Sequence, residues 1–533
     1  MSAPRENQMH PLRWGDPTRA TRLPAEALGL VEFAFGPVSA QDIDPTNTRV
    51  DEAALPQSRF TPDDLAELGG IVGDEQVLTD PATRAGHTRG KSTPDLIRAR
   101  AADLTDAPDV VVRPDTHQQV AELIAWARRN RIAVVPFGGG TAVTGGLVAN
   151  REGFSGVLSL DLRRMNRLLE VDPESMTATL EPGLRGPEAE SLLAEHGMTI
   201  GHFPQSFEYA TIGGFAATRS SGQSSAGYGR FDAQVVGLRV ATPIGELNLG
   251  TAPANAAGPD LRQVILGSEG TFGVITAVRI RVRRVPELKS YQGWSWPDFN
   301  SGAGAIRTLA QAGELPTVIR LSDEAETAIN LADQDSIGAD GTGGCLMIVG
   351  HEGTPEAVAR RQATCAELLT GLGGTALGSD PGEKWAQGRF DAPYLRDSLL
   401  DVGVFVETLE TATFWSRRQE LYEAVSEALR THLPEKHLLL CHISHVYETG
   451  CSLYFTIATR FDGDPIAQWA TAKSAVNDAI TAHGATITHH HAIGTDHRPW
   501  LNREVGTIGV EILRAIKREL DPDGIMNPGV MIP

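Results

Sequence analysis

The feature that most constrains the fold is a glycine-rich stretch, residues 136–146, that directly follows a short apolar run. Five of its eleven residues are glycine, and the run before it, residues 132–135, predicts a buried strand. Glycine tolerates positive φ values and close approach of other groups, so such a loop can turn its backbone N–H groups toward a phosphate or diphosphate. An ordinary turn between two strands is the alternative. The stretch matches neither G-x-x-x-x-G-K-S/T nor G-x-G-x-x-G, so it predicts neither a P-loop nor a Rossmann fingerprint.

Size and charge restrict the classes of protein to which this chain can belong. Its 533 residues are enough for two to four domains with sizeable cores. The net charge of −20 argues against nucleic acid as a ligand. The chain has no run of about 18 apolar residues, so no transmembrane helix is predicted. Its first residues are polar, so no secretion signal is predicted. The cysteines lack disulfide or metal-ligand spacing, which predicts a cytoplasmic protein with reduced thiols and no metal site: Cys345, Cys365, Cys441 and Cys451.

The apolar patterns divide the chain into four predicted parts. These are an N-terminal arm and helical region (1–105), a first domain (106–285), a second domain (286–500), and a C-terminal helix and tail that returns to the first domain (501–533). In the first domain, a strand at 108–114, a helix capped by Thr116 and the strand before the glycine loop favour a parallel arrangement. A second glycine- and serine-rich stretch, 201–229, predicts an unusually long loop, and such loops usually carry function.

Shorter patterns predict the remaining elements. In the first domain they indicate a helix at 187–196 and strands at 156–161, 177–183, 234–242 and 278–283. The second domain is predicted to be α+β, with strands near 317–321, 345–349, 437–442 and 452–458. Its predicted helices lie near 355–370, 414–432 and 465–483, and a last helix follows at 500–520. An acidic, glycine-rich polar loop is expected at 333–344.

Four motifs, in their order and separation, resemble those of flavoproteins of the vanillyl-alcohol oxidase type, which have the p-cresol methylhydroxylase fold. They lie at 136–146, 205–211, 218–221 and 269–275. Within that superfamily the chain most resembles the alkyldihydroxyacetonephosphate synthases, from about residue 84 to about residue 525. The resemblance implies an α+β protein. It would have a two-subdomain FAD-binding domain of the p-cresol methylhydroxylase type and an α+β cap domain with an antiparallel sheet.

The resemblance also implies how FAD is held. Many relatives tether FAD through a histidine in the first loop, but the glycine loop here has no histidine, so noncovalent FAD is expected. The glycine loop would hold the pyrophosphate and the other three motifs would line the rest of the dinucleotide. The residues expected to contact it are Pro136, Phe137, Gly138, Gly139, Gly140, Thr141, Ala142, Gln205, Ser206, Phe207, Glu208, Tyr209, Ala210, Thr211, Thr218, Arg219, Ser220, Ser221, Glu269, Gly270, Thr271, Phe272, Gly273, Val274 and Ile275.

A histidine triplet and a tyrosine are the candidate proton-transfer groups. Histidine titrates near neutrality and can act as an acid or a base, although three adjacent histidines in a strand would alternate between its faces. A solvated cluster is the alternative for His489, His490 and His491, and a core residue is the alternative for Tyr454. The resemblance implies that the three histidines face the flavin and that Tyr454 is the catalytic acid or base. Tyr447 is a competing candidate from the sequence alone.

Two arginines complete the predicted site. Each alone is an ordinary candidate for a surface ion pair. The resemblance implies that Arg396 binds the substrate phosphate, for which a planar guanidinium is well suited, and that Arg320 is needed for activity.

The resemblance predicts an alkyl transferase of ether lipid synthesis. It would exchange the acyl group of an acyl-dihydroxyacetone phosphate for a long-chain alcohol, with FAD unchanged at the end. The expected partner is a small lipid substrate, with peripheral membrane contact and a homodimer left open. The alternative is an FAD-dependent dehydrogenase of D-lactate, glycolate or D-2-hydroxyglutarate. Those enzymes commonly hold a metal through two histidines and a glutamate, but Tyr454 and His490 replace two of these ligands here, while His442 and His445 are possible remnants of the site.

Overall fold

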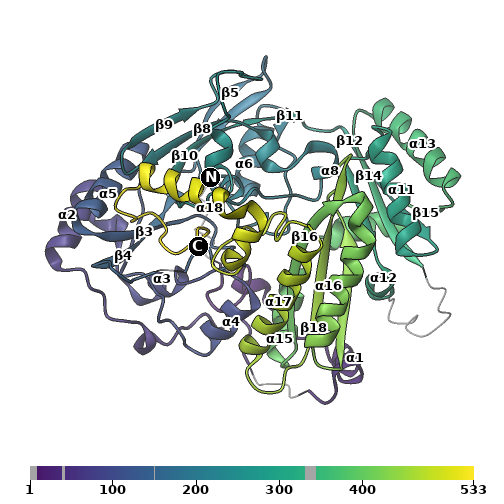
Figure 1. Ribbon diagram of the computed structural model, residues 1–533, viewed down its shortest axis with the longest axis horizontal. Helices are drawn as coiled ribbons and strands as arrows, with labels where there is room; N and C mark the ends of the chain where they lie inside the picture. The colour runs from purple at the N-terminus through teal and green to yellow at the C-terminus, as the bar shows by residue number, and fades with distance from the viewer. Residues whose placement is uncertain (1–8, 39–42, 149, 331–343) are drawn as a thin grey trace.

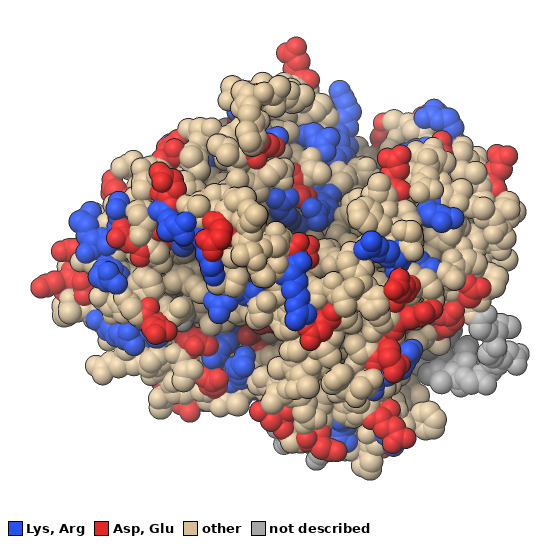
Figure 2. Space-filling view, viewed as in Figure 1, with Lys and Arg blue, Asp and Glu red and all other residues tan. Residues whose placement is uncertain are grey.

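The chain folds into two lobes that lie side by side, in a computed structural model that describes residues 9–38, 43–148, 150–330 and 344–533 (Figure 1). The lobe drawn on the left in Figure 1 contains the glycine loop, and the one on the right contains a large sheet covered by helices. On the face shown in Figure 2, acidic and basic side chains are interspersed over both lobes. In the described part of the chain, no helix combines the length and the apolar composition that crossing a membrane requires.

The first sheet carries the glycine loop at the end of its strand β3. Its strand order is β1 (Val77–Leu78), β2 (Val110–Val112), β4 (Gly156–Asp161) and β3 (Ile132–Phe137). Helix α5 (His117–Asn130) begins as predicted, because the Thr116 side chain accepts a hydrogen bond from the backbone N–H of Gln119. Strands β2 and β3 are parallel, as predicted, but β4 lies between them and pairs with both.

The second sheet is antiparallel and forms the other half of the left lobe. Its order is β5 (Leu168–Asp172), β6 (Thr177–Leu180), β10 (Val274–Arg281), β8 (Val235–Thr242) and β9 (Gly245–Leu249). Strand β10 begins four residues earlier than predicted, because Val274 and Ile275 are buried and already pair with β8. Helix α6 (Gly186–Ala194) lies close to its predicted place.

The glycine- and serine-rich stretch at 201–229 is not a continuous loop, so that prediction was wrong. It contains helix α7 (Ile212–Thr218) and the short helix α8 (Ser225–Tyr228). Helix α7 forms because Thr211 caps it through the backbone N–H of Gly214, and because Ile212 and Phe215 are buried in the core of the second sheet. Few apolar residues were enough to fix this helix.

The right lobe is built on a seven-stranded antiparallel sheet, which confirms the predicted cap architecture. Its order is β15 (Thr375–Gly378), β12 (Leu288–Trp296), β14 (Cys345–Gly353), β13 (Val318–Ser322), β17 (His437–Ile443), β18 (Gly450–Thr459) and β16 (Phe405–Phe414). The helices of this lobe are α11 (Phe299–Gln311), α12 (Glu324–Asn330), α13 (Pro355–Gly371), α14 (Asp380–Gly388), α15 (Ala392–Asp401), α16 (Arg418–His432) and α17 (Pro465–Ala482). The helix predicted from residue 414 starts only at Arg418, because Phe414 ends β16.

The two ends of the chain join the lobes. Helix α1 (Ala25–Phe35) packs Val31 and Phe35 against Val404 of the right lobe, whereas β1 belongs to the first sheet, so residues 1–105 contribute to both lobes. Helix α18 (Leu501–Leu520) leads into a tail that returns to the left lobe, where Val134 N–H donates to the Ile525 carbonyl at 2.8 Å. The loop predicted at 333–344 lies, except for Gly344, outside the described residues.

Candidate active site

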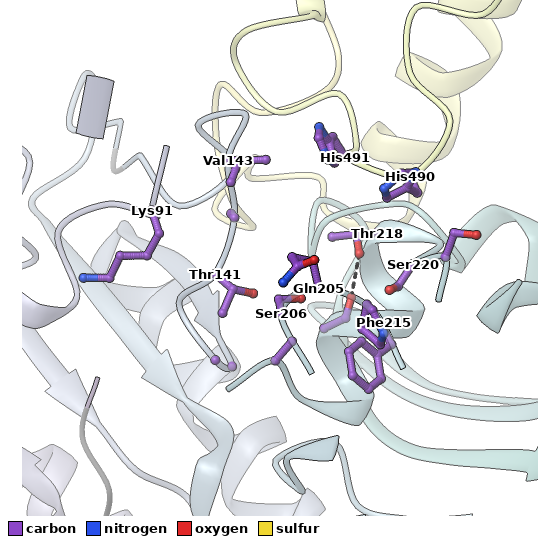
Figure 3. Close-up of a pocket in the computed structure, with 18 of the residues that line it drawn as sticks. Lys91, Thr141, Val143, Gln205, Ser206, Phe215, Thr218, Ser220, His490 and His491 are labelled. Carbon is purple, nitrogen blue, oxygen red and sulfur yellow. Dashed lines mark hydrogen bonds between the residues drawn. The ribbon is translucent and has the colours of Figure 1, made fainter. Parts of the chain in front are cut away.

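A large cavity lies where the glycine loop of the left lobe meets the sheet of the right lobe, and its volume is about 430 Å³. Figure 3 shows Thr141 and Val143 on one side, Gln205, Ser206 and Phe215 below, and His490 and His491 above. The cavity also receives residues of β13, β16 and β18 from the right lobe. Both lobes therefore contribute to one site.

The glycine loop exposes its main chain to this cavity. A Cβ atom on Gly139 would lie 2.1 Å from the Tyr209 carbonyl oxygen, and one on Gly138 would lie 2.4 Å from Thr211 Oγ1. Glycine is therefore required for the loop to pack against residues 209–211. Within the described part of the chain, the backbone N–H groups of residues 138–142 donate no hydrogen bond. Five adjacent unpaired donors on a cavity wall are the chemistry that a dinucleotide diphosphate needs.

Most residues expected to contact FAD line this cavity. They are Pro136, Phe137, Gly138, Gly139, Gly140, Thr141, Ala142, Gln205, Ser206, Ala210, Thr211, Thr218, Ser220, Ser221, Glu269, Gly270, Gly273, Val274 and Ile275. Six others do not line it: Phe207, Glu208, Tyr209, Arg219, Thr271 and Phe272. Two of these six are in ion pairs, because Glu208 Oε1 lies 2.7 Å from Arg19 and Arg219 lies 2.8 Å from Asp232. Three others of the six are buried: Tyr209, Thr271 and Phe272.

The histidine triplet does not lie in a strand, so the predicted alternation between two faces was wrong. Its main chain is irregular and turns around a buried carboxylate, Glu410. His490 and His491 therefore both line the cavity. His489 lies behind them, with its Nε2 2.5 Å from the Tyr447 hydroxyl and its Nδ1 3.0 Å from His490 Nδ1.

The structure separates the two candidate tyrosines. Tyr454 of β18 lines the cavity, and its ring lies 5.6 Å from that of His491 and stacks at 4.8 Å on that of His442. Tyr447 does not line the cavity and is paired with His489. Burial raises the pKa of Tyr454 to about 12 and lowers the pKa of His491 to about 3. At neutral pH the site therefore presents a protonated tyrosine beside a neutral imidazole.

Both predicted arginines reach the cavity. Arg320 of β13 donates to Glu326 Oε1 and lies 3.2 Å from His442 Nε2. Burial alone would raise the pKa of Glu326, but Arg320 and His442 lower it below its ordinary value. Arg396 of α15 donates from Nη1 to the Lys91 carbonyl oxygen at 2.7 Å. Its buried Nη2 lies 3.0 Å from Asp397 Oδ1 but makes no hydrogen bond to any described residue. Arg396 therefore has donor capacity left for a ligand.

Several residues of the site had no signal in the sequence. Glu410 belongs to no recognisable motif, and only the folded structure brings it to the triplet. Lys91 also lines the cavity without such a signal. His445, which the sequence marked only as a possible remnant of a metal site, lines the cavity too, and its Nδ1 lies 3.0 Å from Ser221 Oγ. One nitrogen each from His445, His489 and His490 lies within 4.8 Å of the others, so the predicted absence of a metal site stays a prediction.

Glu269 does more than line the cavity. It adopts φ 52°, and its carboxylate accepts hydrogen bonds from the backbone N–H groups of Ile493 and Gly494 at 3.1 and 2.9 Å. Burial raises the pKa of this carboxyl to about 7, although those two hydrogen bonds oppose the shift. Asn527 of the tail donates to the Glu269 carbonyl oxygen at 2.6 Å. Glu269 thus fastens the end of the histidine segment to the left lobe.

Two family profiles match the chain. The profile described as an FAD binding domain covers residues 108–249, and the one described as FAD linked oxidases, C-terminal domain, covers residues 285–531. The identity to the alkyldihydroxyacetonephosphate synthase of Dictyostelium discoideum is 34% over 496 residues, which span 89% of this chain and 81% of that protein. For the synthase of Trypanosoma brucei brucei it is 34% over 493 residues, 88% of this chain and 80% of that protein.

Solved structures agree with these matches. An alkyldihydroxyacetonephosphate synthase superposes with a TM-score of 0.83 at 30% identity, covering 98% of each chain. A p-cresol methylhydroxylase superposes with a TM-score of 0.70 at 16% identity, covering 90% of this chain and 98% of its own. The second likeness concerns the fold alone, and it confirms the fold class predicted from the four motifs.

Proposed function

Because the chain belongs to the alkyldihydroxyacetonephosphate synthase family, we propose that it exchanges the acyl group of an acyl-dihydroxyacetone phosphate for a long-chain alcohol, using noncovalently bound FAD. One observation carries the proposal. The glycine loop, Tyr454, His490, His491, Arg320 and Arg396 come from both lobes and line a single cavity. An FAD-dependent site with a phosphate ligand and a proton relay needs this combination.

The residues present fit FAD. The unpaired N–H groups of residues 138–142 would hold its diphosphate, and Thr218 and Ser220 would lie along the rest of the dinucleotide. The loop has no histidine to form a covalent link, which supports noncovalent binding. When bound, FAD supplies an electrophilic centre for the exchange.

Arg396 is the proposed phosphate ligand. Its guanidinium is held by Asp397, whose Oδ1 accepts from Nε at 3.0 Å, and by the Lys91 carbonyl. A guanidinium fixed on two sides keeps its planar fork in one orientation, which favours a phosphate dianion over a flexible or neutral group. The phosphate end of the substrate would then lie beside α15.

Tyr454 and the histidines are the proposed proton-transfer groups. A neutral imidazole can accept the proton that leaves the carbon beside the substrate ketone, and a protonated tyrosine can donate one to the leaving carboxylate. The rings of Tyr454 and His491 lie 5.6 Å apart, close enough for both to act on one bound substrate. Arg320, held by Glu326, would fix the position of His442 beneath Tyr454.

The proposed substrates also set expectations for the surroundings of the enzyme. Both are bilayer lipids, so the proposal includes peripheral contact with a membrane surface. Apolar residues of the cavity wall would accept the alkyl chain, among them Val143, Leu147, Val318 and Ile319.

The test is incorporation of labelled hexadecanol into an alkyl ketone phosphate by the purified holoenzyme. The proposal predicts label in the product and release of the fatty acid. Lasting anaerobic bleaching of the flavin by D-lactate, glycolate or D-2-hydroxyglutarate, without incorporation of the alcohol, would establish a 2-hydroxyacid dehydrogenase instead. Acid precipitation should release the FAD into the supernatant, and retention in the pellet would contradict noncovalent binding.

A further inference from the structure

We propose that Glu410 is the positioning residue of the histidine segment: it fixes the main chain of all three histidines and places one negative charge behind them. Glu410 lies on β16, directly opposite Tyr454 in the register of β16 with β18. The side chain is 1% exposed. The kinetic test of this inference rests on the proposed function, whereas the test by chemical modification of the histidines does not.

The contacts of Glu410 converge from consecutive residues. Oε1 accepts the Thr488 hydroxyl at 2.6 Å and the backbone N–H groups of His490 and His491 at 3.1 and 3.0 Å. Oε2 accepts the backbone N–H of His489 at 2.7 Å. A buried carboxylate needs several donors to remain ionised, and main-chain donors that converge in this way form an anion-binding concavity. The segment therefore takes its shape from this one side chain.

The far end of the segment is held independently. Glu269 of the left lobe accepts from Ile493 and Gly494, and Thr144 of the glycine loop donates its hydroxyl to the His491 carbonyl oxygen at 3.0 Å. Between the two carboxylates, Ala492 has φ 72°, a left-handed conformation that alanine rarely adopts. Such a conformation persists only where the surrounding contacts impose it. Glu410 therefore determines the direction in which His490 and His491 enter the cavity.

The charge of Glu410 acts on the rings as well as on the main chain. Its Oε2 lies 3.5 Å from His490 Nδ1. Burial lowers the pKa of each of the three imidazoles, and Glu410 opposes that shift in all three. The other titratable and charged groups around His490 are Arg230, His202, His442, His445, His489, His491 and Tyr454. Loss of the charge therefore moves the protonation of these imidazoles to lower pH.

Three variants of the full-length holoenzyme test the inference. Glu410→Gln removes the charge, Glu410→Asp keeps it, and Glu504→Gln is the matched control. Glu504 is an exposed carboxylate that accepts one backbone hydrogen bond from Ile487, just before the triplet, and does not face the histidines. The readouts are FAD content, kcat, KM, the pH–rate profile, and the rate at which diethylpyrocarbonate modifies each histidine, mapped by mass spectrometry.

We expect Glu410→Gln to lower kcat about a hundredfold, because a displacement of about 1 Å in catalytic groups costs a factor of that order, with KM changed less than about threefold. The histidine limb of its pH–rate profile should move to lower pH, FAD content should be unchanged, and Glu410→Asp should recover part of the activity. Faster modification at residues 489–491 in both variants, with unchanged modification of His351, a buried histidine of β14, would support anchoring and exclude general unfolding as the cause. Unchanged modification in Glu410→Asp and Glu410→Gln, or equal effects in Glu504→Gln, would overturn the inference. If the wild type shows no alcohol exchange, the proposed function fails, while the modification rates still decide the role of Glu410.

Discussion

The glycine loop and the histidine segment face each other across one cavity, yet they are built in opposite ways. The loop offers its own main-chain N–H groups and needs glycine so that residues 209–211 can pack against it. The histidine segment presents side chains to the cavity, and its main-chain N–H groups donate hydrogen bonds to two carboxylates from different lobes. The glycines of the loop itself therefore determine the main-chain site. The side-chain site depends on carboxylates that lie far from the histidines in the sequence.

The first way to break this comparison is to put a side chain into the loop. Gly139→Val places a branched Cβ against the Tyr209 carbonyl, which the backbone there cannot avoid. We expect a cost above about 4 kcal/mol and a protein that purifies without FAD. The ratio of flavin to protein absorbance measures this. Gly304→Val is the control, since no atom of the described residues lies within 4 Å of a Cβ at that helical position, and equal flavin loss there would contradict the account.

The second test concerns Glu269, which holds the end of the histidine segment against the left lobe. Because burial raises the pKa of Glu269 from 4.5 to about 7, its contribution to stability is fully present below about pH 4.5 and is lost as the pH rises through about 7. The expected loss is on the order of 3 kcal/mol. Glu269→Gln should therefore unfold with a midpoint that depends less on pH between about 4 and 8 than that of the wild type. Parallel pH dependence in the two proteins would show that Glu269 does not titrate in this range.

The third test changes a side chain that acts directly on the proposed ligand. Arg396→Lys keeps the charge but loses the planar fork, so KM for the acyl-dihydroxyacetone phosphate should rise about tenfold with kcat little changed. Steady-state kinetics with the phosphate-bearing substrate measures this. Arg514→Lys, a surface substitution near the C-terminus, should match the wild type. An unchanged KM in Arg396→Lys would place the phosphate elsewhere.

The same contrast explains which parts of the molecule could be predicted from the sequence. The glycine loop and α5 with its Thr116 cap were predictable, because local residue types determine them. The antiparallel cap sheet was implied only by the family resemblance. The helix inside 201–229 was missed, because a few buried side chains outweighed its glycine-rich composition. The triplet was assigned to a strand for a related reason, since its true shape depends on Glu410, 79 positions earlier in the chain. Local propensity carries no information about such an anchor.

Tyr454→Phe is the measurement that tests the central claim most directly, because it leaves the glycine loop untouched. FAD content and hexadecanol incorporation should be measured on the same preparation as the wild type. The account predicts equal flavin per chain and an exchange rate lower by about a thousandfold, since the lost hydroxyl is the proposed proton donor. Tyr447→Phe, which alters the partner of His489 outside the cavity, should cost far less. Full exchange activity in Tyr454→Phe, or loss of its flavin, would contradict the division between a lobe that holds the cofactor and a lobe that performs the chemistry.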